Sequence, residues 1–342
     1  MKRITKILLI VGLLLLLVIV LAPLLLVHQI YQESFGEPVE TPAALAYPFD
    51  EFPDLNVEEF VLERDNNQDI YTFLFTPDDD STEANALIVL APGLGGATEF
   101  YTPLINYLVQ SGYHVLSYDP SGHDKTADDD GFGSFSQGMV DADDILTHVT
   151  ENHEDYADLP IVAMGHSWGG YSMGGSLEWH PEIEAAVLFA AFDRPGLLMD
   201  DEAEVIAGSA FATILKPYFR IYEFIRNSSH ANQTVVDGVT NAEIPTLMLH
   251  SEDDPITDGP LSFDIFEEEL SALDWVEIEV AADRGHSFMF YSEEDRETFA
   301  PFDTIDEEEI EAQSDGFERP SSVEIDDDYM TQVINFIEEN IE

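Results

Sequence analysis

Short, uninterrupted apolar runs alternate along this chain with segments of helical periodicity. The runs occupy residues 86–91, 113–119, 160–164, 184–191, 244–250 and 276–281. They are typical of strands in a parallel sheet whose two faces are both buried, because a strand with one solvent-exposed face would alternate polar and apolar residues. The segments with helical patterning are residues 100–111, 136–152, 168–179, 211–225 and 327–341. The alternation predicts an α/β fold in which helices flank a mostly parallel central sheet.

The remaining segments define the predicted domain organisation. Residues 57–64 and 69–76 read as two strands of a hairpin that turns at Asn66-Asn67. Residues 56–342 are expected to form one domain. Residues 195–243 interrupt its alternation of strands and helices and are expected to form an inserted cap. Residues 292–326 are acidic and weakly patterned, which favours a surface excursion.

The N-terminus carries a separate signal. Residues 7–27 form 21 consecutive residues without a charge, enough for a helix to cross a hydrocarbon core of about 30 Å. Lys2, Arg3 and Lys6 precede this stretch and should stay in the cytoplasm. A cleaved signal peptide is the alternative, but its apolar core usually spans only about 7–15 residues before a small-x-small site. We therefore expect residues 1–27 to be a single-pass membrane anchor with the domain outside the cytoplasm, joined through a proline-containing linker at 28–55.

The charge is extreme. Seventy Asp and Glu oppose twelve Lys and Arg, giving a net charge of −58. Such a surface repels nucleic acid, so no nucleic-acid partner is expected. The excess of acidic residues also indicates adaptation to high salt, where screening limits the range of repulsion between the carboxylates to a few ångströms. The chain has no cysteine, which excludes disulfides and thiolate metal sites, and its histidines show no metal-ligand spacing. Neither a metal nor another cofactor is expected.

A candidate nucleophile lies directly after one of the buried runs. Residues 165–169 read Gly-His-Ser-Trp-Gly, which fits G-x-S-x-G, and a segment rich in small residues follows. A strand, a sharp turn and a helix in this order hold a serine exposed above the end of a sheet. Ser167 is therefore the predicted nucleophile. A serine hydroxyl needs a base, and the base needs an orienting acid.

Two later loops offer those groups. The run at 244–250 leads into an acid-rich loop that contains Glu252, Asp253 and Asp254, and the run at 276–281 leads into Gly285-His286. Asp193, which follows an earlier run, is a further candidate for the acid.

These features together resemble the α/β-hydrolase superfamily from about residue 57 to 342. The matching motifs are PGLGG at 92–96, YDPSGH at 118–123, GHSWGG at 165–170, LMLHSEDDPI at 247–256 and DRGHSF at 283–288. The resemblance implies Ser167 as nucleophile, Asp254 as acid and His286 as base, with the backbone N–H groups of Leu94 and Trp168 as oxyanion donors. Two positions depart from the usual pattern: Ser251 replaces a glycine, and Pro92-Gly93 replaces His-Gly.

The expected activity is hydrolysis of small-molecule carboxylic esters, of the carboxylesterase or lipase type. A peptidase or amidase with the same triad is one alternative, and a surface-anchored binding protein with a vestigial site is another. Cations cluster in and next to the cap, because Arg194, Lys216, Arg220 and Arg226 all lie between residues 194 and 226. Pairing with Glu202, Glu204 or Glu223 would explain them locally, and contact with an anionic substrate group or a lipid headgroup is the other interpretation.

Overall fold

The computed structural model describes residues 2–64, 69–78, 84–127, 131–156, 158–196, 209–257, 259–304 and 307–341. The predicted turn at Asn66-Asn67 lies outside these ranges. So do cap residues 197–208, which include Glu202 and Glu204.

A single sheet of eight strands organises the described part of the domain, in the order β1-β2-β4-β3-β5-β6-β7-β8. The strands are β1 (Leu55–Leu62), β2 (Ile70–Pro77), β3 (Leu87–Ala91), β4 (His114–Tyr118), β5 (Ile161–His166), β6 (Ile183–Phe189), β7 (Thr246–Ser251) and β8 (Val276–Ala281). Strand β2 pairs antiparallel with β1 and with β4, and β3 to β8 all run parallel. The predicted mostly parallel sheet is confirmed.

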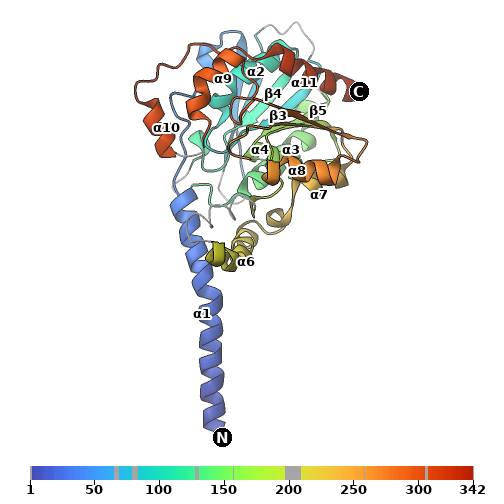
Figure 1. The fold of residues 1–342 in the computed structure, drawn as a ribbon. Coiled ribbons are helices and arrows are strands. Elements are labelled where there is room, and N and C mark those ends of the chain that lie inside the picture. The colour runs from blue at the N-terminus through green and yellow to red at the C-terminus, as the bar shows by residue number, and fades with distance from the viewer. Residues whose placement is uncertain are drawn as a thin grey trace.

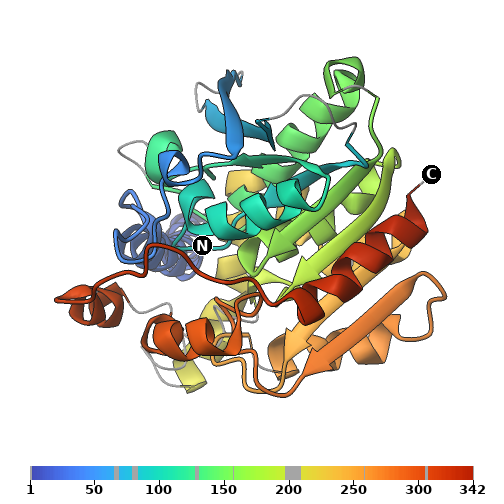
Figure 2. The same ribbon diagram turned by 90° about the horizontal axis from the view of Figure 1, so that it is seen from above.

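Helices cover both faces of this sheet (Figure 2). They are α2 (Thr102–Gln110), α3 (Gln137–Glu151), α4 (Trp168–Ser176), α7 (Val235–Ala242), α8 (Phe263–Leu270) and α11 (Asp327–Asn340). Alternate side chains of one strand enter different cores: Leu87 and Val89 pack in the core with α3 and α4, whereas Ile88 and Leu90 pack in the core with α2 and α11. Burial on both faces explains why β3 has no polar residue.

The acidic segment 292–326 is more ordered than its weak pattern predicted. It contains α9 (Glu293–Phe299) and α10 (Glu307–Ser314). Phe299 and Phe302 are buried against the α2–α11 core. The two helices are too short to show a clear amphipathic period in the sequence. A few apolar contacts, rather than a continuous apolar stripe, attach the segment to the domain.

Helix α1 (Lys2–Phe35) projects from the domain as a long rod (Figure 1). It is long and apolar enough to cross a membrane, and its most apolar window is wholly exposed. The helix ends eight residues later than the predicted anchor, because Val27, Tyr31 and Phe35 are buried against the domain. The rest of the expected linker also packs: Tyr47 is buried, and the Thr41 hydroxyl donates to Asp124 at 2.8 Å.

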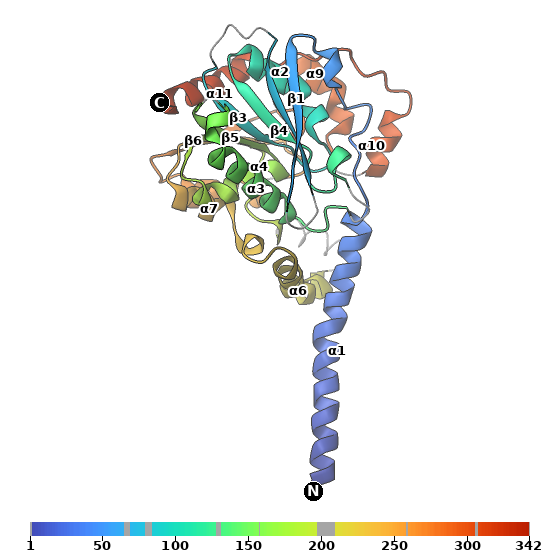
Figure 3. The same ribbon diagram turned by 180° about the vertical axis from the view of Figure 1, so that it is seen from behind.

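The cap helix α6 (Ser209–Asn227) lies beside the domain-proximal part of α1 (Figures 1 and 3). The Tyr31 and Tyr222 rings stack with centroids 4.4 Å apart, and the Tyr31 hydroxyl donates to Glu223 at 2.6 Å. Glu223 also accepts from the backbone N–H groups of Phe135 and Ser136. This buried carboxylate therefore ties α1, α6 and the start of α3 together.

Candidate active site

Ser167 occupies the turn between β5 and α4 in a strained conformation, with φ 55° and ψ −116°. The surrounding glycines make this turn possible. A Cβ on Gly169 would lie 2.1 Å from the Ala91 carbonyl oxygen, and a Cβ on Gly165 would lie 2.3 Å from the Gly169 carbonyl oxygen. Any larger residue would push α4 away from β3 and β5. The sequence pattern thus serves a close strand–helix approach that presents the serine at the carboxyl edge of the sheet.

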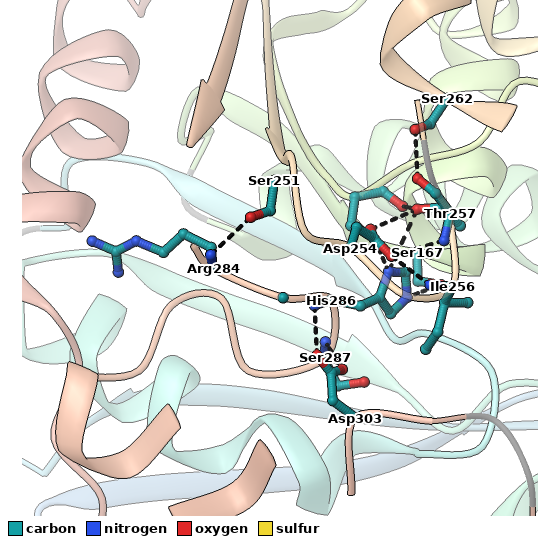
Figure 4. A network of polar contacts seen from close by, with 12 residues as sticks. Ser167, Ser251, Asp254, Ile256, Thr257, Ser262, Arg284, His286, Ser287 and Asp303 are labelled. Atoms are coloured by element: carbon teal, nitrogen blue, oxygen red, sulfur yellow. Dashed lines mark hydrogen bonds and ion pairs between the residues drawn. The ribbon is translucent and has the colours of Figure 1, made fainter. Parts of the chain in front are cut away.

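The three predicted side chains meet at this edge (Figure 4). His286 Nε2 lies 2.8 Å from Ser167 Oγ, and His286 Nδ1 lies 2.8 Å from Asp254 Oδ2. An ionised carboxylate only accepts hydrogen bonds, so Nδ1 carries the proton and Nε2 accepts from the serine hydroxyl. This is the tautomer that a general base for Ser167 requires.

The loop around Asp254 holds it as a carboxylate. Its Oδ1 accepts from the N–H groups of Ile256 and Thr257, each at 2.8 Å, and its Oδ2 accepts from the Thr257 hydroxyl at 2.8 Å. Burial alone would raise the pKa of Asp254, but the adjacent His286 and these hydrogen bonds outweigh it and lower the pKa to about 2. Thr257 was not anticipated from the sequence, and no motif signals it.

The competing acids are engaged elsewhere. Asp253 Oδ1 accepts from the Ser251 hydroxyl at 2.6 Å and from Gly285 N at 2.9 Å. Asp193 accepts from Val236 N and pairs with Arg194 at 2.9 Å, and Glu252 is exposed. Of the four candidates, Asp254 contacts the imidazole of His286.

Ser251, which departs from the usual glycine, links the acid loop to the base loop. Its hydroxyl donates to Asp253 and accepts from Arg284 N at 2.7 Å, two residues before the histidine (Figure 4). The departure therefore adds a connection between the two loops that a glycine could not make.

Within the described residues, the N–H groups of Leu94 and Trp168 donate to no acceptor, whereas those of Gly93, Gly95 and Ser167 do. Gly93 N donates to Tyr101 Oη at 2.8 Å, and Gly95 N donates to His123 Nε2 at 3.3 Å. The loop is thus held on both sides of Leu94. Two free donors beside Ser167 are what an oxyanion hole needs.

Two further groups support the site: His166, whose place beside the nucleophile in the motif indicates a structural role, and Asp303, which no sequence pattern marks. His166 Nδ1 lies 2.7 Å from Tyr101 Oη, and its Nε2 lies 3.0 Å from the carbonyl oxygen of His286. Burial, with a contribution from the nearby His286, lowers the pKa of His166 to about 3, so it stays neutral. Asp303 accepts from the N–H groups of His286 and Ser287 at 2.9 and 2.8 Å. Asp303 lies 17 residues from His286, in the segment predicted to be a surface excursion, so no local pattern could connect them.

A cavity of about 820 Å³ opens onto Ser167 and His286. Its apolar lining comes from Leu94, Phe132, Phe135, Trp168, Phe192, Ile256, Leu261, Phe302 and Ile310. The last turn of α1 contributes Glu33, Ser34 and Phe35 to the same wall, and α10 contributes Glu311 and Ser314. Segments predicted to be linker and surface excursion therefore shape the pocket.

Comparison with known proteins supports the fold. Residues 82–223 match a family model described as serine aminopeptidase, S33. The Pyrococcus furiosus esterase PF2001 aligns over 90% of this chain and 100% of its own, at 13% identity and a TM-score of 0.57. The Pyrococcus horikoshii acylaminoacyl peptidase aligns over 70% of this chain and 38% of its own, at 16% identity and a TM-score of 0.51. No curated protein matches the sequence.

Proposed function

We propose that this chain is a serine hydrolase of the α/β-hydrolase superfamily that cleaves carboxylic esters through an acyl-enzyme at Ser167. The observation that carries the proposal is the continuous hydrogen-bond chain from Asp254 through His286 to Ser167, with both distances at 2.8 Å. A vestigial site would have no reason to keep the correct tautomer, a strained serine and two free oxyanion donors together.

The geometry suits a two-step reaction. His286 Nε2 takes the proton from Ser167 Oγ as this oxygen attacks the ester carbonyl carbon. The N–H groups of Leu94 and Trp168 stabilise the resulting oxyanion, and Asp254 stabilises the imidazolium. The C–O bond to the alcohol then breaks, and His286 returns its proton to the leaving oxygen. Water repeats the sequence on the acyl-enzyme, which releases the carboxylic acid and restores Ser167.

The apolar wall of the cavity favours an ester with a hydrocarbon portion, because such walls supply affinity for apolar acyl or alkyl groups. A second candidate is an aminopeptidase or amidase. It has a specific observation in its favour: Glu33, Glu40 and Glu311 line the same cavity and could pair with a substrate ammonium group. Rates on p-nitrophenyl esters and on aminoacyl p-nitroanilides, measured side by side, would decide between the two.

The test of the serine mechanism uses a fluorophosphonate probe. Wild-type protein should be labelled at Ser167, and Ser167→Ala should lose both labelling and at least about a thousandfold in turnover. His286→Ala should lose a similar factor. Thermal unfolding of both variants serves as the control for folding. A well-folded Ser167→Ala protein that keeps most of its activity would exclude the mechanism, and wild-type protein that resists the probe would favour a binding protein.

We further propose that residues 1–27 anchor the enzyme in the cell membrane with the domain outside the cytoplasm. The charge-free stretch 7–27 and the basic residues before it support this topology. Burial of Val27 in the core of the domain also favours retention of the helix, because cleavage near residue 28 would remove this side chain. Alkaline carbonate extraction should leave the protein in the membrane fraction. Recovery of a soluble form that begins near residue 28 would show a cleaved signal peptide instead.

A further inference from the structure

The cap helix α6 exposes a stripe of large apolar side chains. Ile214, Ile221, Phe224 and Ile225 are 57%, 42%, 54% and 65% exposed. Among the described residues outside α1, the only other large hydrophobic side chain with such exposure is Val61. At 3.6 residues per turn the four positions fall within an arc of roughly 100°. A contiguous apolar face on one helix marks a contact surface.

The stripe is directed away from the domain. Leu215, Phe219 and Tyr222 form the buried face of the same helix, and they lie on its other side by helical position. Arg220 is exposed at the edge of the stripe. A wide apolar face bordered by a basic residue is the arrangement of helices that lie in the interface of a bilayer.

A hydrogen bond places α6 at the depth of the apolar segment of α1. The Tyr218 hydroxyl donates to the carbonyl oxygen of Ile19 at 3.0 Å. Ile19 precedes Val27, the end of the charge-free stretch, by eight residues, or about 12 Å along the helix. The contact therefore lies well inside the segment proposed to cross the membrane, and it fixes α6 beside it (Figure 3).

The acceptor of this bond is a carbonyl that α1 itself cannot satisfy. In an α-helix the carbonyl of Ile19 would accept from the N–H four residues later, and that residue is Pro23. Hydrocarbon offers no replacement donor, so an unpaired carbonyl at this depth is unfavourable. Tyr218 supplies the missing donor from the cap helix.

We propose that α6 lies in the domain-proximal leaflet of the bilayer that α1 crosses, with its apolar stripe in contact with lipid, and that the enzyme draws lipid esters from that leaflet. The second clause rests on the proposed esterase function. It follows from the position of the cavity, because Glu33, Ser34 and Phe35 of α1 line it. Glu33 is six residues past Val27, about 9 Å above the end of the apolar stretch. An apolar chain can therefore pass from the leaflet into the cavity over a short path.

The position of α6 can be tested without reference to activity. Because the natural chain has no cysteine, single cysteines at Phe224 or Ile225 can carry an environment-sensitive fluorophore in the full-length protein. Val61→Cys is the matched control, since Val61 is as exposed as Ile221 and lies on β1. In phosphatidylcholine–phosphatidylglycerol vesicles, lipids with a doxyl quencher high on the acyl chain should lower the fluorescence at 224 and 225 by about twofold or more. Quenching there that is no stronger than at Val61 would overturn the membrane position of α6.

The substrate class is tested with a double variant, Phe224→Asp with Ile225→Asp. The measured quantity is the rate on a long-chain p-nitrophenyl ester in vesicles divided by the rate on dissolved p-nitrophenyl acetate. We expect this ratio to fall by about tenfold or more, because two carboxylates oppose insertion, whereas Val61→Asp should leave it unchanged. An unchanged ratio in the double variant would overturn the lipid-ester clause.

Failure of the proposed function gives a different result. Wild-type protein would then cleave neither ester and resist the fluorophosphonate, while the quenching data would still decide the position of α6. Thermal unfolding in detergent is the control for folding of the double variant, which should fold like wild type because Phe224 and Ile225 are exposed.

Discussion

Replacing Asp254 with asparagine tests the site most sharply, because the structure dictates how the amide must sit. Asp254 Oδ1 accepts from two backbone N–H groups, those of Ile256 and Thr257. An amide NH₂ at that place would leave both buried donors without an acceptor, at about 1–3 kcal/mol each. The asparagine oxygen is therefore held there, and the NH₂ group faces His286 Nδ1.

This orientation reverses the tautomer of the base. The NH₂ group donates to His286 Nδ1, so the imidazole proton moves to Nε2, which then cannot accept from Ser167. The Thr257 hydroxyl, which loses Oδ2 as its acceptor, still has the Ala190 carbonyl oxygen at 3.2 Å, so it does not resist the change. A wrong tautomer in a serine triad costs about four orders of magnitude in kcat, or roughly 5.4 kcal/mol of transition-state stabilisation.

The assay is kcat on p-nitrophenyl acetate together with the rate of fluorophosphonate labelling. Asp253→Asn is the matched control, one residue away in the same loop. It should stay within about tenfold of wild type, because its hydrogen bonds go to Ser251 and Gly285 rather than to the imidazole. A folded Asp254→Asn protein with more than about a tenth of wild-type kcat would refute the tautomer argument. A larger loss of kcat in Asp253→Asn than in Asp254→Asn would show that Asp254 is not the acid of the triad.

Three further predictions concern stability. The pKa of Asp254 in the folded state is about 2, below its usual 3.8, so the ionised carboxylate stabilises the fold fully above the higher value and loses this effect as pH falls toward the lower one. Between about pH 5 and about pH 3, the difference in unfolding free energy between wild type and Asp254→Asn should therefore shrink by about 1 kcal/mol. A constant difference would contradict this linkage. With a net charge of −58, the melting temperature should rise between about 0.01 M and about 1 M sodium chloride as the screening length falls from about 30 Å to about 3 Å, and a flat or falling curve would remove the basis for salt adaptation. Gly169→Ala puts a Cβ 2.1 Å from a backbone oxygen and should cost about 1–3 kcal/mol or more by denaturant titration, whereas Gly196→Ala, with open space at its Cβ, should unfold like wild type.

The sequence by itself determined the parts of the molecule that local patterns encode. Strands such as β3 and β5 were predictable because burial on both faces requires a continuous apolar run. Ser167 was predictable because a strained turn between a strand and a helix requires glycines at fixed positions. The helix α1 was predictable because its length and lack of charge are local properties.

Tertiary structure decided what depends on residues far apart in the chain. The resemblance implied Asp254, but the residues of the loop alone left Asp253 and Glu252 open, because the fold decides which carboxylate turns toward His286. The role of Asp303 and the burial of Phe302 could not be read from a short acidic segment, since both arise from contacts with other elements.

The pairing of Tyr218 with the carbonyl of Ile19 spans 199 residues. Neither residue carries a pattern that marks the other. A periodicity reports the environment of one segment, whereas such a contact depends on the path of the whole chain. For this reason the position of α6 beside α1, and the membrane contact that we infer from it, became visible in the folded molecule and not in the sequence.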